Sequence, residues 1–225
     1  MKVSVIIPAY NEQNTVGVIL SRVLALPFEK EVIVVDDGST DGTGVQLEKF
    51  AGERCLRVFR HEKNSGKGFA VITGLKNASG EVVVIQDADM EYSPEEIPKM
   101  LRAIENGADA VYGSRLKGTM TGMTLTHLVG NVALTLAARI LYGSGLSDME
   151  TGYKMFRRGV VKWETLKSKN FEIEPEITAR IIKAGHRIEE VPITYSGRPK
   201  KEKKIGVKDG FIALAWLVKC RFERG

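Results

Sequence analysis

Three acidic residues follow a short apolar run in the middle of the chain. Val82 to Ile85 reads as a buried strand, and Asp87, Asp89 and Glu91 come within the next six positions. Closely spaced carboxylates repel one another unless a cation neutralises them. Asp87 and Asp89 would share one face of a strand, and at its end both could reach a hard divalent ion such as Mg²⁺ or Mn²⁺. We therefore predict a metal site here.

These acids could also be solvated turn residues ahead of a helix. The stretch "SPEE" at 93–96 starts such a helix, and acidic side chains stabilise a helix N-terminus. We interpret Glu95 and Glu96 in that way. For Asp87 and Asp89, polar residues at the ends of neighbouring strands favour the metal-binding interpretation.

Polar, turn-forming residues recur where the other apolar runs end. They are "PAYNE" at 8–12, "DDGSTD" at 36–41 and "GSR" at 113–115. We assign Asp37 a binding role and interpret Asp36 as structural, because "DGST" is also ordinary turn chemistry. The stretch "NSGKG" at 64–68 could be a loop that starts a helix, but glycines around a lysine also make a compact anion site in which Lys67 would face phosphate. The Walker loop pattern is absent.

Short β-branched runs alternate with helical patterns in the first half of the chain, which predicts an α/β fold. Such near-continuous apolar strands indicate a mostly parallel sheet covered on both faces. These sheets bind ligands beyond the carboxyl ends of their strands, where the polar residues should gather. The predicted strands are Val3–Ile7, Glu31–Val35, Leu56–Phe59, Glu81–Ile85 and Ala108–Tyr112, and the predicted helices are 14–25, 42–51, 67–78 and 94–105.

After residue 115 the alternation stops. We expect a flexible loop at 116–124, and then an apolar helix to about Leu141 whose apolar face, with Met123, Leu128 and Leu136, is mostly core. A helix at 174–184, a strand at Arg187–Tyr195 and a final helix follow. We predict one domain at 1–206 and a C-terminal basic amphipathic helix at 207–225.

The composition limits the class of protein. The 225 residues carry a net charge of +5 and two cysteines, Cys55 and Cys220, so neither a disulfide framework nor a Cys-rich zinc site is available. The opening "MKVSVIIPAY" is too short an apolar run for a secretory signal. The apolar stretch from Leu125 to Tyr142 contains polar interruptions and is not expected to span a membrane. We expect a cytoplasmic protein, peripheral at the cytoplasmic face of a membrane.

Basic residues concentrate near the C-terminus. Five of the seven residues from Arg198 to Lys204 are Lys or Arg, but no RNA-binding motif accompanies them, so nucleic acid is not an expected partner. The stretch "GFIALAWLVKCRF" at 210–222 then places apolar residues at helical spacing between basic ones. Such a helix is typical of an interfacial membrane anchor or of a helix that docks on the sheet, and the sequence leaves both open.

Taken in order, these stretches resemble one enzyme family. "VSVIIPAYNE", "VIVVDDGSTD", "HEKNSGKGFA", "GEVVVIQDAD" and "VYGSR" are similar to the nucleotide-sugar-binding half of family 2 glycosyltransferases with the GT-A fold. "DMETGYKMFRR", "FEIEPEIT", "EVPITY" and "GRPKKEKKIG" resemble the dolichyl- or polyprenyl-phosphate mannose and glucose synthases of that family. The motifs are modest singly, and the specificity of the resemblance lies in their joint order.

The resemblance implies a nucleotide-diphosphate sugar as donor and Mg²⁺ or Mn²⁺ as cofactor. Asp87 and Asp89 match the DXD element that holds the metal on the donor diphosphate, and Glu91 can join them. Glu91 stands where mannose synthases often have Gln, which leaves the coordination and the donor open. The predicted nucleotide-binding residues are Pro8, Ala9, Tyr10, Glu12, Val35, Asp37, Lys67, Asp87 and Ala88.

The resemblance also implies inverting transfer of a hexose, with the metal stabilising the leaving nucleoside diphosphate. We predict GDP-mannose as donor and a polyprenyl or dolichyl phosphate as acceptor, which is largely a dianion at neutral pH and needs no general base. The predicted catalytic residues are Asp89, Arg115 and Asp148, and Arg115 and Arg198 match positions that meet the acceptor phosphate. Asp148 stands where hydroxyl-directed members keep a base, or else it braces the turn at Thr151–Gly152.

Two alternatives keep the same fold: a UDP-glucose-dependent polyprenyl-phosphate glucosyltransferase, and a family 2 transferase that acts on a glycan hydroxyl. A sugar-phosphate nucleotidyltransferase would need a glycine-rich, Arg-containing loop after the first strand, which "PAYNEQNT" does not supply. A non-catalytic nucleotide-binding module at a membrane is the remaining alternative. The expected partners are the donor, the acceptor and a membrane surface, and a separate membrane-anchoring protein is a further candidate.

Overall fold

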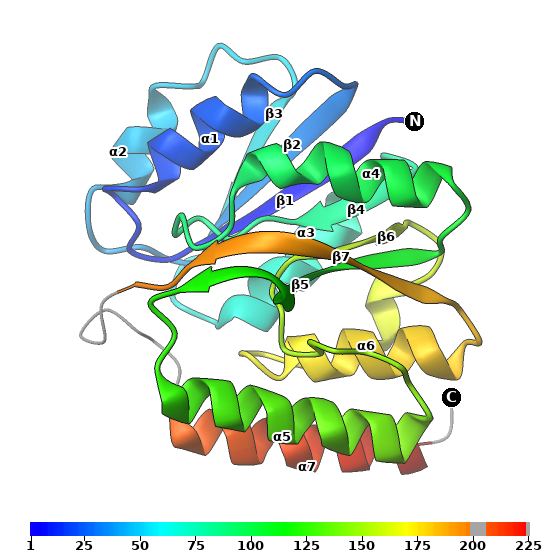
Figure 1. Ribbon diagram of the computed structural model, residues 1–225. Helices are drawn as coiled ribbons and strands as arrows, with labels where there is room; N and C mark the ends of the chain where they lie inside the picture. The colour runs from blue at the N-terminus through cyan, green and yellow to red at the C-terminus, as the bar shows by residue number, and fades with distance from the viewer. Residues whose placement is uncertain (199–205, 224–225) are drawn as a thin grey trace.

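A seven-stranded sheet organises the computed structural model, which describes residues 1–198 and 206–223 (Figure 1). The strand order is β3-β2-β1-β4-β6-β5-β7. The strands are β1 (Val3–Ala9), β2 (Lys30–Asp36), β3 (Leu56–Arg60), β4 (Val82–Ile85), β5 (Ala110–Thr121), β6 (Lys154–Arg157) and β7 (Ile188–Ser196). Only β6 runs antiparallel to its neighbours, β4 and β5, among these strands. The predicted α/β class and mostly parallel sheet are confirmed.

Helices cover both faces of this sheet. They are α1 (Val16–Leu24), α2 (Thr43–Glu48), α3 (Lys67–Asn77), α4 (Ile97–Glu105), α5 (Leu125–Tyr142), α6 (Ile173–Lys183) and α7 (Val207–Phe222), with short 3₁₀ turns η1 (Pro94–Glu96) and η2 (Trp163–Thr165). Val5 and Ile7 of β1 belong to the core under α1 and α4, whereas Ile6 packs with α3 on the opposite face. A strand buried on both sides needs an uninterrupted apolar run, which is why β1 could be predicted.

The stretch 116–124 was predicted as a flexible loop, and this prediction was wrong. Strand β5 continues to Thr121, and residues 119–121 pair with 194–196 of β7 after an irregularity that follows Ser114. Gly118 passes so close to β7 that a Cβ atom there would lie 1.9 Å from the carbonyl oxygen of Ile193. Glycine at position 118, within the predicted loop, is therefore required by the close approach of two strands.

Helix α5 was predicted to be mostly core, and this was also wrong. Its buried residues are Leu134, Thr135 and Ala138, while Leu136 is 53% exposed. By length and composition α5 is the one helix among the described residues that could cross a membrane, and 17% of it is buried. Neither property was expected from the sequence.

Helix α7 docks on the rest of the structure through one of its faces. Ala213, Leu217 and Cys220 are buried, and α7 lies beside both α5 and α6 (Figure 1). Its opposite face, with Phe211 and Phe222, is exposed. The sequence left open a membrane anchor or a helix that docks on the sheet. The structure has α7 docked on α5 and α6 instead, and the exposed face remains available for the other alternative. The predicted division of the chain at residue 206 stays a prediction.

Candidate active site

A strained turn presents Asp87 and Asp89 at the carboxyl end of β4. Met90 has a φ of 63°, in the left-handed region that non-glycine residues rarely adopt. The backbone N–H of Glu91 donates to Oδ1 of Asp89 (3.1 Å), and the buried side-chain amide of Gln86 donates to two backbone carbonyls of the turn (3.1 Å each). These bonds hold the strained conformation, and with it the position of the two carboxylates.

Asp87 is paired with Lys67, the first residue of α3. Nζ of Lys67 lies 2.8 Å from Oδ1 and 3.0 Å from Oδ2 of Asp87, and 3.1 Å from Oε1 of Glu174. Burial alone would lower the pKa of Lys67, but the two carboxylates outweigh burial and hold this pKa above its ordinary value. Lys67 therefore keeps a permanent positive charge beside Asp87.

Asp89 is paired with Arg198, which follows β7. Nη2 of Arg198 lies 3.0 Å from Oδ2 of Asp89 and 2.8 Å from Oε1 of Glu12. Of the basic stretch 198–204, only Arg198 falls within the described residues. The fold thus brings together a predicted acceptor-binding residue, a predicted nucleotide-binding residue and a predicted metal ligand.

The predicted three-acid metal set is not assembled. Both oxygens of Glu91 are engaged, one by the Tyr195 hydroxyl (2.7 Å) and the other by the backbone N–H of Arg198 (2.8 Å). Within residues 1–198 and 206–223 no group of three or more His, Cys, Asp or Glu side chains could hold a metal ion. Asp87 and Asp89 remain, and two carboxylates on one turn fit Mg²⁺ or Mn²⁺, which takes further ligands from water and substrate phosphate.

Arg115 and Asp148 form a buried ion pair. Nε and Nη2 of Arg115 donate to the two carboxylate oxygens of Asp148 (2.8 and 2.7 Å), and the backbone N–H of Arg115 donates to Oδ2 (2.9 Å). The side chains are 7% and 1% exposed. This geometry argues against Asp148 as a general base, because its carboxylate is enclosed and already paired. A contact between Arg115 and the acceptor phosphate stays a prediction.

The other predicted nucleotide-binding residues lie at the ends of β1, β2 and β4. Pro8, Ala9, Val35 and Ala88 are buried there, and Tyr10 is half-buried.

Asp37 is occupied by its own protein neighbours. Its carboxylate accepts hydrogen bonds from the backbone N–H groups of Ser65 (3.0 Å) and Gly66 (2.7 Å) and lies 2.6 Å from Nδ1 of His61. Asp37 thus fixes the segment 61–66 that leads into α3. Its contact with a nucleotide, like those of the other residues, stays a prediction.

Two buried charged residues behind the site were not predicted. Nζ of Lys154 lies 2.6 Å from Oε2 of Glu174, and the two residues are 0% and 4% exposed. A signal was present in the sequence, because Lys154 interrupts the apolar run Tyr153–Phe156, and it proved to be the first residue of β6. A charge in a buried run needs an ionic partner.

The comparison with protein families decides the assignment of the chain. Glycosyl transferase family 2 matches residues 4–163. The chain belongs to this family. The resemblance stated from the sequence motifs is therefore confirmed.

Relatives within the family carry related names. A dolichol-phosphate mannosyltransferase of Pyrococcus furiosus is 34% identical over 221 residues, covering 95% of this chain and 62% of that protein. A polyprenol monophosphomannose synthase of Mycolicibacterium smegmatis is 31% identical over 98% of this chain and 88% of that protein. An undecaprenyl-phosphate mannosyltransferase of Micrococcus luteus is 34% identical over 99% of this chain and 97% of that protein. The chain spans less than two thirds of the Pyrococcus protein.

Solved structures support the fold. Glucosyl-3-phosphoglycerate synthase from Mycobacterium tuberculosis, crystallised with Mn²⁺, uridine diphosphate and phosphoglyceric acid, superposes with a TM-score of 0.75 at 21% identity. The match covers 100% of this chain and 80% of that one. The predicted GT-A fold is thereby confirmed.

Proposed function

We propose that this family 2 member transfers mannose from GDP-mannose to a polyprenyl or dolichyl phosphate, with inversion at the sugar carbon. The names of three relatives, each a polyprenyl-type phosphate mannose enzyme, support this proposal. The structural observation that carries it is the convergence of two carboxylate–cation pairs, Asp87–Lys67 and Asp89–Arg198, at one edge of the sheet.

These pairs suit a reaction between two phosphate-bearing substrates. A divalent ion held by Asp87 and Asp89 would supply Lewis-acid stabilisation of the leaving diphosphate. Lys67 and Arg198 are the chain's own cations at this place, and their N–H groups are suited to phosphate oxygens. Asp87 and Asp89 thus fix a cation, while Lys67 and Arg198 orient anions.

The state of Asp148 favours a phosphate acceptor. A sugar hydroxyl must lose a proton during transfer, so a transferase acting on a glycan needs a base near the acceptor. Asp148, the predicted candidate, is enclosed by Arg115. A phosphate acceptor is largely a dianion at neutral pH and needs no such base. The UDP-glucose alternative keeps the same acceptor, and Glu91, at a position that is often Gln in mannose synthases, is its sequence signal.

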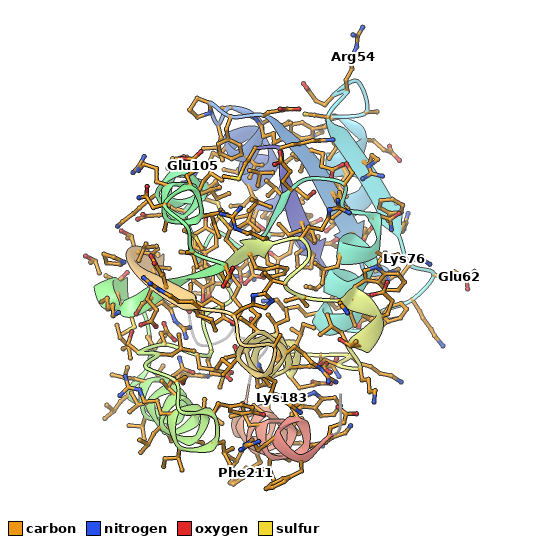
Figure 2. The ribbon with its side chains drawn as sticks, turned by 90° about the vertical axis from the view of Figure 1, so that its right-hand side faces the viewer. Arg54, Glu62, Lys76, Glu105, Lys183 and Phe211 are labelled. Atoms are coloured by element: carbon orange, nitrogen blue, oxygen red, sulfur yellow. The ribbon has the colours of Figure 1, made fainter. Side chains whose placement is uncertain are left out.

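We further propose a membrane as the surface on which the lipid acceptor is met. Helices α5 and α7 lie side by side (Figure 1). Both carry exposed apolar residues, and Phe211 points away from the domain (Figure 2). These exposed residues, which we call the α5–α7 face, are Leu125, Val129, Val132, Leu136 and Ile140 on α5, and Phe211, Ile212, Leu214, Val218 and Phe222 on α7.

Basic residues adjoin the α5–α7 face. Lys208, Lys219 and Arg221 of α7 are exposed, and each basic residue near an anionic membrane contributes about 1 kcal/mol of attraction. An apolar face beside basic residues is typical of peripheral binding to anionic lipid. This supports a peripheral location at the cytoplasmic face, and a separate anchoring protein remains a candidate partner.

A partition assay tests the proposed activity. The full chain is incubated with polyprenyl phosphate, Mn²⁺ and either GDP-[¹⁴C]mannose or UDP-[¹⁴C]glucose, and the label is followed into an organic phase. We expect lipid-linked label from GDP-mannose and none with Asp89→Asn. If only UDP-glucose gives lipid-linked label, the donor is UDP-glucose and not GDP-mannose. No lipid-linked product from either donor, together with transfer to a glycan hydroxyl, would overturn the proposal.

A further inference from the structure

Four charged side chains form a line that runs inward from the carboxylate turn. Asp87, Lys67, Glu174 and Lys154 follow one another with N–O distances of 2.8, 3.1 and 2.6 Å. They come from the turn after β4, from α3, from α6 and from β6. Negative and positive charges alternate along the line, so each ion has an opposite neighbour.

Glu174 occupies a special place in this line. Its Oε2 is paired with Lys154, whereas its Oε1 is buried and lies 3.1 Å from Nζ of Lys67. Burial alone would raise the pKa of Glu174, but Lys154 and Lys67 hold it below its ordinary value. Glu174 is therefore an anion with one oxygen on Lys154 and the other on Lys67.

Gly152 lies close to Lys67 on another side. A Cβ atom at Gly152 would lie 2.7 Å from Oδ2 of Asp87 and 3.2 Å from Nζ of Lys67. The backbone N–H of Gly152 donates to the hydroxyl of Tyr92 (3.1 Å), which fixes this approach. The amine of Lys67 thus lies between two anions, with Gly152 close beside it.

We propose that Glu174 is a positioning residue that keeps Lys67 in place when Asp87 engages a divalent ion. This inference rests on the proposed function. Asp87 cannot give the same lone pairs fully to Lys67 and to a metal ion, so metal binding weakens the Asp87–Lys67 pair. Without a second anion, a buried ammonium would then lose its partner, which is strongly unfavourable. Glu174 removes that penalty and so strengthens metal binding at Asp87 without touching the ion.

A purely structural role predicts different behaviour. If Glu174 and Lys154 only stabilise the fold, replacing both leaves no buried charge unpaired, and both stability and metal binding should return. If Glu174 positions Lys67, the double replacement restores stability while metal binding stays weak. Lys154→Met alone also distinguishes a structural role of Glu174 from a positioning role. It leaves the Lys67–Glu174 pair intact, so a positioning role predicts that metal binding is kept.

The test measures Mn²⁺ affinity of the full chain by electron paramagnetic resonance, with Mn²⁺ alone and with added GDP or UDP, beside the thermal unfolding midpoint. The variants are Glu174→Gln, Lys154→Met, the double variant and Asp87→Asn. Replacing a residue that supports a metal ligand typically lowers metal affinity about 10–100-fold. We expect that loss for Glu174→Gln and for the double variant, near-normal affinity for Lys154→Met, and a midpoint that recovers in the double variant.

The inference is overturned by wild-type Mn²⁺ affinity in the double variant, or by a loss of affinity with Lys154→Met as large as with Glu174→Gln. Failure of the proposed function shows itself differently, since Asp87→Asn would then bind Mn²⁺ as well as the wild type does. Loss of binding in Asp87→Asn with normal binding in Glu174→Gln removes the inference alone.

Discussion

The guanidinium of Arg198 bridges Glu12 and Asp89, with Nη2 2.8 Å from the first carboxylate and 3.0 Å from the second. A residue that follows the last strand thus neutralises acids that follow the first and fourth strands. Lys67 does the same for Asp87. Asp87 and Asp89 are thus each paired with a cation of the chain itself, and binding a metal ion with an anionic substrate would exchange these ion pairs for others.

Arg198→Ala should separate metal binding from sugar transfer. Two carboxylates lose their cation, so Mn²⁺ affinity should be kept or increased. Transfer to polyprenyl phosphate should fall by about 10²-fold, as for loss of one preorganised charged donor. Calorimetric Mn²⁺ titration and the partition assay measure the two quantities, with Arg198→Lys as the charge-retaining control. Reduced Mn²⁺ affinity or unchanged transfer in Arg198→Ala would contradict this assignment.

Asp148→Asn should lower the free energy of unfolding. Breaking a buried ion pair leaves the charge of Arg115 uncompensated and costs about 3–5 kcal/mol. Urea denaturation measures this loss. Glu189→Gln, which breaks the exposed pair with Arg187, is the matched control and should cost about 0–1 kcal/mol. An Asp148→Asn protein as stable as the wild type but inactive would restore the base hypothesis.

Glu150 predicts a pH dependence of stability. Burial raises the pKa of this carboxyl from 4.5 to about 7, and its Oε1 has no hydrogen-bond partner among the described residues. Between these values the folded chain binds more protons than the unfolded chain, so this group makes stability fall as pH rises through the window. Glu150→Gln should raise the thermal midpoint at pH 8 by about 2–4 °C, which corresponds to roughly 1 kcal/mol.

The same substitution should have a much smaller effect at pH 5, where Glu150 is protonated in the folded chain. Thermal unfolding of both proteins at pH 5 and pH 8 is sufficient to check this. An equal difference at the two pH values would mean that the ionisation of Glu150 is not its cause.

Charges placed on the α5–α7 face should weaken membrane binding. Leu136→Glu and Phe222→Glu each remove an apolar side chain that would be buried in lipid, an effect of at least about tenfold in affinity. Co-sedimentation with vesicles containing anionic lipid measures the change. Val45→Glu on α2 alters a residue of similar exposure, 60%, outside this face, and should bind normally. Equal loss in Val45→Glu would point to a general charge effect.

Gly152→Ala should damage the site through contact alone. The added methyl would lie 2.7 Å from Oδ2 of Asp87, so either the segment 150–153 or the turn must shift, at a cost of about 1–3 kcal/mol. Both the Mn²⁺ affinity and the free energy of unfolding should therefore fall in Gly152→Ala. At Gly159 an added Cβ meets nothing within 4 Å, so Gly159→Ala is the control. Unchanged Mn²⁺ affinity in Gly152→Ala would show that the turn adapts.

The fold of the first half could be predicted because each of its units carries its own local signal. Val82–Ile85, for example, is an apolar run that ends in turn residues, and it forms β4. Strand β6 has only four residues, and it exists because β4 and β5 pair with it on both sides. The need for glycine at position 118 likewise arises from the close approach of β7. A local sequence pattern does not show which distant segments will pair.

The same limit applies to the site. Asp87 and Asp89 stand out because two acids follow a buried strand, but their partners come from elsewhere in the chain. Arg198 meets Glu91 across 107 positions. Whether Asp148 is a base or a brace depends on where Arg115 lies, 33 positions away. Residue types suggested the chemistry, and the fold determined which groups are paired.

The central claim is that Asp87 and Asp89 act through a bound divalent ion. Transfer of mannose from GDP-mannose to polyprenyl phosphate should be measured with the full chain before chelation, after chelation with EDTA and after Mn²⁺ is added back. We predict that transfer is lost on chelation and recovers with Mn²⁺, and that Asp89→Asn does not recover. Transfer that continues undiminished in EDTA would contradict the claim.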